Sequence, residues 1–402
     1  MAVKVCINGQ MKKIDTALHK PVIFLNGQKK VLSKAWMFVN GEKKMLWGQP
    51  GIQVDLISND GLLTGINNII AIGEDWAIMD NRAGVVSRIG ISNLSSPSLI
   101  QGVSWGVDYG QSYYQSSAGE KVFYGYLSSP RTLNKLGIDY SDGVVSVKKS
   151  YTMANISTGN IIMGDIGNSS IQAERLSKYW AQPTSITREY GTRFYVNGAS
   201  AYSIGHQPSS VSDGNYGPRM SSVYFQDSAT TWLIGCVGFG SYASQNGFWH
   251  ATTSGTSKYH NSIGVDPVML DGDNIVGQSY SPGEMNLVDK TSMAILYTSE
   301  SFASNTMSFK FVGRNGGYYY IIQYPKVAVQ DGVVTLYLLD VDDLSTVYSQ
   351  VLPTDPFGEY NGVSTFWNGC STTLDITGSG FLGVAGNENG KMRIVRFSEL
   401  LN

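Results

Sequence analysis

Residues 68–103 read NIIAIGEDWAIMDNRAGVVSRIGISNLSSPSLIQGV. Four short runs of β-branched and other apolar residues alternate in this stretch with Gly, Asn, Asp and Ser, which is the pattern of strands joined by tight turns. We expect strands over residues 68–72, 76–79, 85–92 and 99–103. The stretch therefore predicts one four-stranded antiparallel sheet.

The same pattern recurs along the chain. A matching group covers residues 310–312, 318–322, 333–340 and 347–351, and in both groups the third run ends in a turn with a Leu that we expect to be buried (Leu94, Leu344). Leu400 follows a similar run. First strands are expected near residues 67, 113, 160, 222, 264, 309 and 363, a spacing of about 49 residues that is typical of propeller blades. We predict an all-β fold, a β-propeller over residues 51–402 with seven blades, or six as the alternative.

The two ends of this region predict how the ring closes. The last unit has no room for an outer strand before the chain ends at Asn402, and the run at residues 52–57 has no place in the first unit. We expect the strand near residues 52–57 to complete the last blade, since a propeller closed in this way leaves no open edge. Elsewhere a helical period is nearly absent, and residues 171–180 are a weak helix candidate.

The first 48 residues repeat a smaller unit three times. Asn8-Gly9, Asn26-Gly27 and Asn40-Gly41 each lie between two apolar runs and are followed within a few residues by Lys-Lys. Asn-Gly between β-prone runs is a strong β-hairpin signal. Because isolated two-stranded hairpins are marginal in water, the units must stack on each other or on a partner. We interpret residues 1–48 as an attachment module.

Composition excludes several function classes. Charged residues make up 15% of the 402 residues, the net charge is -2, and three Cys lie far apart in the sequence. We therefore expect no nucleic acid partner, no disulfide framework and no membrane insertion. Nine of the 29 basic residues are Lys in residues 1–48, which is explained either by soluble hairpin tips or by an acidic docking partner. No leader precedes the first strand, so we expect folding in a cytoplasm.

Catalytic motifs are not found in the sequence. The four His and three Cys have no zinc-type spacing, and no nucleophile elbow, phosphate loop or dinucleotide fingerprint occurs. The acidic turns at residues 271–274 and 340–343 lack the full set of calcium ligands, and a hairpin turn explains both better. We predict no catalytic residue, metal or cofactor. A glycan-binding or glycan-hydrolysing propeller and an intracellular protein-interaction propeller remain alternatives.

Aromatic clusters are the candidates for surface binding, since rigid, partly polar rings are common in binding surfaces. Packing between blades is the competing explanation for each of them. We single out Trp249 and His250, and Tyr318 and Tyr319. We also expect residues 203–220 to form a long functional loop.

The repeated pattern of apolar strand, Asn-Gly and Lys-Lys resembles short N-terminal repeats in structural proteins of tailed bacteriophages and prophages. The resemblance covers about an eighth of the chain. It implies a virion protein, a tail, neck or capsid-attached fibre or appendage, assembled in the host cytoplasm. It also implies that residues 1–48 contact other virion proteins and that the propeller faces bacterial surface glycan or protein, or neighbouring subunits. The docking residues implied are Asn8, Gly9, Asn26, Gly27, Asn40, Gly41, Trp36 and Trp47.

Overall fold

We describe a computed structural model of the whole chain. The residues it describes are 3–7, 10–14, 22–25, 28–31, 34–39, 42–48, 52–59, 68–80, 85–92, 98–104, 114–115, 120–128, 131–152, 161–166, 168–182, 185–197, 199–210, 216–226, 232–239, 247–254, 256–261, 266–279, 283–326, 333–357, 366–373, 379–388 and 391–398. Side chains are described for part of these, mainly in the first two and the last three four-stranded sheets. The chain divides into two compact units, Met1–Ile52 and Gln53–Asn402.

The first unit contains three separate two-stranded hairpins. Facing partners at the turns are Ile7 and Gln10, Leu25 and Gln28, and Val39 and Glu42. Two residues therefore separate the strands of each hairpin, at the positions of the Asn-Gly pairs, which themselves lie outside the described residues. The strands are β1 (Val3–Ile7), β2 (Gln10–Ile14), β3 (Val22–Leu25), β4 (Gln28–Val31), β5 (Lys34–Val39) and β6 (Glu42–Gly48).

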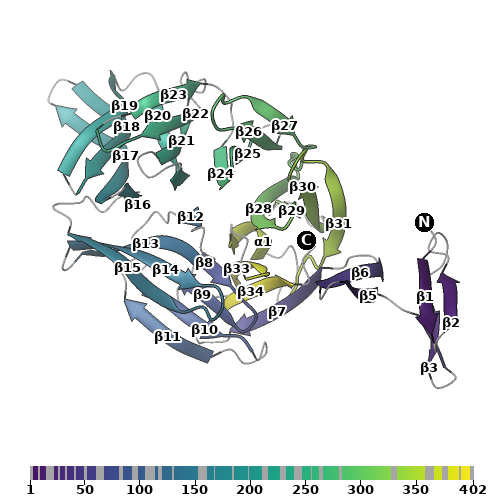
Figure 1. Cartoon of the computed structure of the whole chain (residues 1–402). Coiled ribbons are helices and arrows are strands. Elements are labelled where there is room, and N and C mark those ends of the chain that lie inside the picture. Colours follow the sequence, from purple (N-terminus) through teal and green to yellow (C-terminus); the bar gives the residue numbers. More distant parts are fainter. Residues whose placement is uncertain are drawn as a thin grey trace. The chain divides into compact units, whose positions relative to one another are not determined.

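The second unit is an all-β propeller whose described strands form seven four-stranded antiparallel sheets (Figure 1). Sheet 1 contains β8 (Asn68–Ile72), β9 (Trp76–Asp80), β10 (Val85–Gly90) and β11 (Ser98–Ser104). Sheet 2 contains β12 (Tyr114–Gln115), β13 (Glu120–Ser128), β14 (Arg131–Asp139) and β15 (Val145–Thr152). Sheet 3 contains β16 (Ile161–Ile166), β17 (Ser169–Gln182), β18 (Ser185–Val196) and β19 (Ala199–Ser210).

The remaining sheets follow in chain order. Sheet 4 contains β20 (Tyr216–Gln226), β21 (Trp232–Phe239), β22 (Gly247–Ala251) and β23 (Thr256–Asn261). Sheet 5 contains β24 (Asp266–Asp271), β25 (Asn274–Gln278), β26 (Met285–Asp289) and β27 (Ile295–Thr298). Sheet 6 contains β28 (Met307–Asn315), β29 (Tyr318–Pro325), β30 (Val334–Asp340) and β31 (Thr346–Leu352). Sheet 7 contains β32 (Ser371–Thr372), β33 (Leu382–Glu388), β34 (Lys391–Ser398) and β7 (Gln53–Asn59).

Each sheet contacts the next, and the last contacts the first. Buried residues of sheets 1 and 2 share one cluster, and those of sheets 5 and 6 share another. Strand contacts join sheet 2 to 3 (β13 to β16), 3 to 4 (β18 to β20), 4 to 5 (β20 to β24), 6 to 7 (β28 to β33) and 7 to 1 (β33 to β8). The contacts therefore close a ring, which defines a β-propeller.

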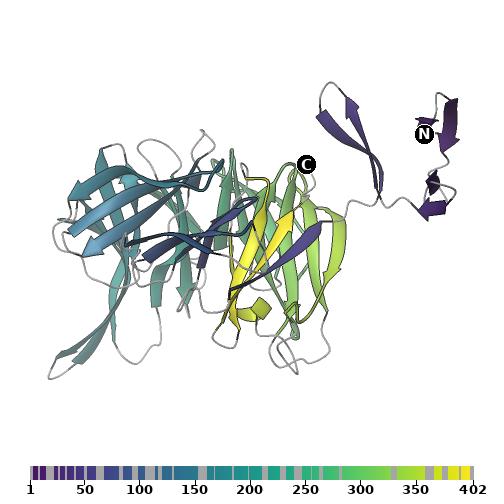
Figure 2. The same ribbon diagram turned by 90° about the horizontal axis from the view of Figure 1, so that it is seen from below.

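Sheet 7 joins the two ends of the propeller. Strand β7 pairs antiparallel with β34 over seven register positions, from Gln53 opposite Ser398 to Asn59 opposite Met392. Figure 2 shows β7 in purple beside the yellow C-terminal strands. The predicted closure by the strand near residues 52–57 is confirmed.

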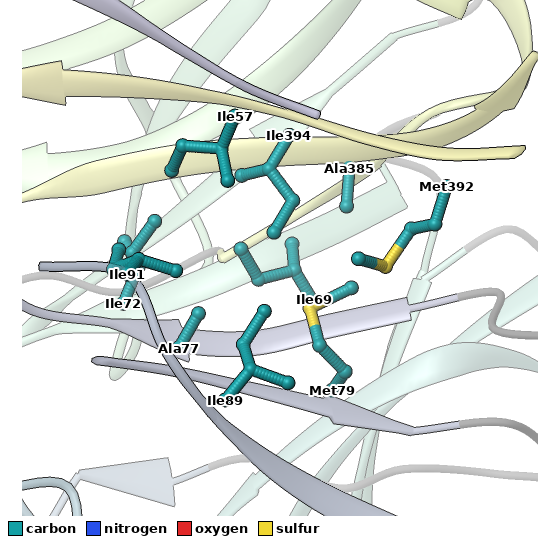
Figure 3. Close-up of a cluster of buried hydrophobic side chains, with 10 residues drawn as sticks. All are labelled: Ile57, Ile69, Ile72, Ala77, Met79, Ile89, Ile91, Ala385, Met392 and Ile394. Carbon is teal, nitrogen blue, oxygen red and sulfur yellow. The ribbon is translucent and has the colours of Figure 1, made fainter. Parts of the chain in front are cut away.

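The core between sheets 7 and 1 is aliphatic (Figure 3). Ile57 of β7 and Ile394 of β34 meet Ile69 and Ile89 of sheet 1, and all four are at most 2% exposed. Both faces of sheet 1 are covered, because Ile70 and Ile78 pack in the cluster shared with sheet 2. This explains why β8 and β9 of sheet 1 are apolar runs rather than alternating ones.

The structure corrects two secondary-structure predictions. Residues 171–180 are not a helix but the middle of β17, which is paired with β16 on one side and β18 on the other. Residues 203–220 are not a long loop, since β19 and β20 cover most of them. Pro208 is compatible with β19 because that strand lies at the edge of its sheet, and Pro218 falls where the register of β20 shifts.

Helix is nearly absent. Among the described residues one helix is found, α1 (Phe366–Gly369), near the start of sheet 7. In that part of the chain no helix has the length and apolar character needed to span a membrane.

Candidate functional site

Three sheets carry the same turn between their third and fourth strands, which we call the outer turn. The outer turns are residues 139–144 in sheet 2, 289–294 in sheet 5 and 340–345 in sheet 6. Each begins with an Asp whose carbonyl oxygen accepts a hydrogen bond from the amide four residues later, at 2.8 Å for Asp139, 2.8 Å for Asp289 and 3.0 Å for Asp340. The amide of each Asp donates to the carbonyl five residues later at 3.0 Å. The outer turns thus share one backbone conformation.

The Asp side chain stabilises the outer turn. Its Oδ1 accepts the amide two residues later, at 2.8 Å for Asp139, 3.2 Å for Asp289 and 2.8 Å for Asp340. The hydroxyls of Ser141 and Ser292 also donate to their Asp. Hydrogen bonds from these Ser side chains and then from their amides lower the pKa values of Asp139 and Asp289. Asp is the residue that this turn favours, because its short carboxylate reaches the backbone two residues on.

The fifth residue of each outer turn has left-handed backbone angles. Gly143, Met293 and Leu344 have φ of 69°, 58° and 60°. A side chain in this conformation costs about 1–2 kcal/mol. Leu344 compensates by packing into the core shared by sheets 5 and 6, where it is 1% exposed. The expected burial of Leu344 is confirmed, whereas Leu94 and Leu400 lie outside the described residues.

The connections from first to second strand, which we call inner turns, lie beside the outer turns because alternate turns of an antiparallel sheet share one end. The Trp76 ring, next to the inner turn of sheet 1, lies between the backbones of Gly73 and Gly143. A β-carbon added at either Gly would lie 2.4 Å or 2.3 Å from the ring. The Nη2 of Arg88 in sheet 1 donates to the Asp142 carbonyl oxygen in sheet 2.

The turns of sheets 5 and 6 meet in the same way. Arg314 Nε lies 3.0 Å from Asp271 Oδ2, and the Tyr319 hydroxyl donates to the same oxygen at 2.7 Å. Val341 N of the outer turn donates to Gly317 O of the inner turn at 3.0 Å. We call the described inner and outer turns together the turn face: residues 73–75, 139–144, 271–274, 289–294, 315–317 and 340–345.

The turn face is acidic. Lys290 of the turn face is paired with Asp273 at 3.1 Å, and Arg314, which precedes the inner turn of sheet 6, is paired with Asp271 at 3.0 Å. A surface with this excess of carboxylates attracts cations and basic protein segments. Among the described residues, no group of three or more metal-ligating side chains is placed to hold an ion. The exposed acids of the turn face are Glu74, Asp75, Asp139, Asp142, Asp273, Asp342 and Asp343.

The predicted surface tyrosines have different environments. Tyr319 is 1% exposed, so its prediction as a surface-binding residue is wrong. Burial, with the neighbouring Asp271 carboxylate adding to it, raises the pKa of the Tyr319 hydroxyl above its ordinary value. Tyr318, at the start of the same strand, is half-buried. Trp249 and His250 lie in β22, but their side chains lie outside the described residues.

The predicted docking residues lie in the first unit. Asn8, Gly9, Asn26, Gly27, Asn40 and Gly41 fall outside the described residues. Trp36 lies in β5, opposite Met45, and Trp47 lies in β6, opposite Ala35. Their side chains also fall outside the description.

Sequence reasoning missed the outer turns of sheets 2 and 5. The signal was present: an Asp ends the third strand, and the fourth strand begins six residues later. Asp139 and Asp289 follow this pattern, as does Asp340. These two turns do not resemble the turn of sheet 6 in sequence at the fifth position, where sheets 2 and 5 have Gly143 and Met293 in place of a Leu.

Comparisons with known proteins show little beyond this. No protein-family model matches the sequence, and no curated protein matches it. Among solved structures, the WD40 beta propeller domain of Doa1 is similar, with 15% sequence identity and a TM-score of 0.42, over 86% of this chain and 96% of that one. The assignment as a propeller rests on the sheets and on their closed ring of contacts.

Proposed function

We propose that this chain is a structural attachment protein of a bacteriophage particle. In this proposal residues 1–48 dock onto other virion proteins, and the propeller is displayed for binding to host surface or to neighbouring subunits. Each of the seven four-stranded sheets is one blade of the ring. A more general form of the proposal, a non-catalytic propeller that binds other proteins, does not require that the chain belong to a virion.

The observation that carries the proposal is the repeated hairpin. Three two-stranded hairpins occur in the first unit, and in the sequence an Asn-Gly pair separates the two strands of each hairpin. Their strands are four to seven residues long, and hairpins of this size need further surface to be stable. A partner that covers the hairpins would supply that surface, as docking onto a particle does.

The distribution of charge also supports separate roles for residues 1–48 and for the propeller. Residues 1–48 carry nine Lys and two acids, so 9 − 2 = +7. Residues 49–402 carry the other 20 basic and 29 acidic residues, so 20 − 29 = −9. Opposite charges on the two segments favour different partners for each, with an acidic partner for the hairpins.

The test uses the full-length chain during particle assembly. Six Lys that follow the Asn-Gly turns are replaced by Gln, and the amount of chain in purified particles is measured by immunoblot. We expect a loss of at least tenfold, because each Lys contributes to steering and contact with an acidic surface. The six are Lys12, Lys13, Lys29, Lys30, Lys43 and Lys44.

A control variant replaces Lys148 and Lys149 of β15 in the propeller. It should enter particles at the normal level. Normal incorporation of the six-fold variant, or absence of the wild-type chain from particles, would contradict the proposal.

A further inference from the structure

Strand β7 is the outermost strand of sheet 7, and β34 is its neighbour in that sheet. It brings Ile57, which is fully buried, into the core between sheets 7 and 1. Loss of β7 would uncover that core and leave the edge of β34 open, because β7 contributes the fourth strand from the other end of the chain. Ring closure therefore depends on one short strand.

A buried ion pair joins β7 to β34. Arg396 Nε and Nη2 donate to Asp55 Oδ2 at 2.9 Å and 2.8 Å, and the two residues face each other in the register. Asp55 is 6% exposed and Arg396 8%. The other oxygen of Asp55 accepts Gln53 Nε2 at 2.8 Å. A buried pair of this kind specifies one register, because either partner left alone would be a buried charge without compensation.

The same guanidinium also holds sheet 1. Arg396 Nη1 donates to the carbonyl oxygen of Gly73 at 3.1 Å and to that of Glu74. The Arg396 guanidinium also lies 5.0 Å from the centre of the Phe381 ring. One side chain thus connects the closing strand, its partner strand and the inner turn of the first sheet. The interactions that close the ring converge on Arg396.

The ion pair lies close to the end of the strand pair from which both chain ends leave. Gln53, the first residue of β7, faces Ser398, the last residue of β34. Asp55 and Arg396 form the third register pair from that end. Tension applied at residue 52 would therefore break the pairs one after another, beginning with Gln53 and Ser398. Four residues, 49–52, separate β7 from the hairpin strand β6.

We infer that β7 is a detachable clasp of the propeller and that the Asp55–Arg396 pair is the lock that keeps it attached. With the lock in place, β7 separates from β34 only in rare openings, and the ring is closed most of the time. Without it, β7 separates while sheets 5 and 6 stay folded. The clasp is a property of the propeller alone; that tension reaches it through residues 1–48 rests on the proposed attachment function.

The test is amide hydrogen exchange on the purified full-length chain, read by mass spectrometry. In Asp55→Asn we expect peptides that cover residues 53–59 and 391–398 to exchange at least tenfold faster than in wild type. Peptides of β29 and β30 should keep their wild-type rates. The matched control is Asp273→Asn, which removes an ion pair with Lys290 from an exposed turn and should change neither region.

Two results would overturn the inference. Amide exchange of residues 53–59 at the wild-type rate in Asp55→Asn would show that the ion pair does not hold β7 in place. Equal acceleration in the peptides of β29 and β30 would show that the pair supports the whole fold rather than the clasp. No virion is present in this experiment, so its outcome is independent of the attachment proposal.

A second variant keeps the test valid if Asp55→Asn does not fold. Gln53→Cys and Ser398→Cys in one chain put two thiols at facing positions, where the spacing of facing strand residues suits a disulfide. Oxidation should slow exchange in residues 53–59 and 391–398 at least threefold compared with the reduced form of the same variant. Equal exchange in the two forms would mean that β7 does not detach, and would also overturn the inference.

Discussion

The contact of Trp76 with two glycines allows backbone strain and side-chain crowding to be measured separately. Gly143 has φ of 69°, and a β-carbon there would lie 2.3 Å from the Trp76 ring. Gly73 has no left-handed φ, and its β-carbon would lie 2.4 Å from the same ring. Gly272 has φ of 61° and nothing within 4 Å of its added β-carbon. An alanine would therefore suffer both backbone strain and crowding at Gly143, crowding alone at Gly73, and backbone strain alone at Gly272.

The free energies follow from these three environments. Left-handed backbone costs an alanine about 1–2 kcal/mol, so Gly272→Ala should destabilise the protein by about that amount. Crowding in a packed site costs about 1–3 kcal/mol, and Trp76 is 1% exposed, so the ring has little room to move. This second amount is expected for Gly73→Ala. Gly143→Ala combines the two and should cost roughly 2–5 kcal/mol.

Urea denaturation followed by far-ultraviolet circular dichroism measures the three changes. Each shift in midpoint, multiplied by a common slope, gives the change in the free energy of unfolding. Gly143→Ala should shift the midpoint the most, and Gly272→Ala should match the strain cost alone. If Gly143→Ala and Gly272→Ala cost the same, the contact between Trp76 and the outer turn of sheet 2 is not tight, and the reasoning is refuted.

Three other predictions test the ring and its turns. Lys121 Nζ donates to the carbonyl oxygens of Ile70 and Thr373 at 2.6 Å and 2.7 Å. Lys121→Met should lower the free energy of unfolding by about 2–4 kcal/mol, because it leaves these buried carbonyl oxygens without this donor. A loss under about 0.5 kcal/mol in urea denaturation would contradict this. Leu344→Ala should cost about 2–5 kcal/mol by opening a cavity between sheets 5 and 6, and a thermal midpoint equal to that of wild type would count against it. The pKa of Asp139 is lowered in the folded state, so its contribution to stability is present above the unfolded pKa of 3.8 and is lost as the pH falls through the lower folded pKa. Asp139→Asn should therefore lose less thermal stability than wild type on acidification from about pH 5 to about pH 3. Parallel pH profiles of the two proteins would refute the assignment.

Much of the propeller could be predicted because its signals are local. Short apolar runs between turn residues predicted the strands of sheets 1 and 6, and the unpaired run at residues 52–57 predicted the closing strand. The first strand of sheet 7 was less well placed, since it was expected near residue 363 and is found at Ser371–Thr372. Residues 171–180 failed because their composition suits a helix or a strand, and pairing with β16 and β18 decides between them.

The candidate site could not be predicted as a surface, because it depends on contacts between distant residues. Arg88 and Asp142 are 54 positions apart, Asp271 and Tyr319 are 48 positions apart, and nothing near any of these residues in the sequence indicates its partner. The neighbouring tyrosines Tyr318 and Tyr319 look equivalent in sequence, but Tyr319 packs in the core shared by sheets 5 and 6, whereas Tyr318 is half-buried. The sequence shows the Asp of each outer turn separately, but only the closed ring of sheets places these turns on one face of the propeller.

The central claim is that residues 1–48 hold the chain on a virion while the propeller carries the displayed surface. Electron cryomicroscopy of intact particles that contain the chain tests it most directly. We expect ring-shaped density with one blade for each four-stranded sheet, exposed to solvent, and residues 1–48 in contact with other virion proteins. Particles without this density, or a propeller buried against the virion with residues 1–48 touching no other subunit, would contradict the account.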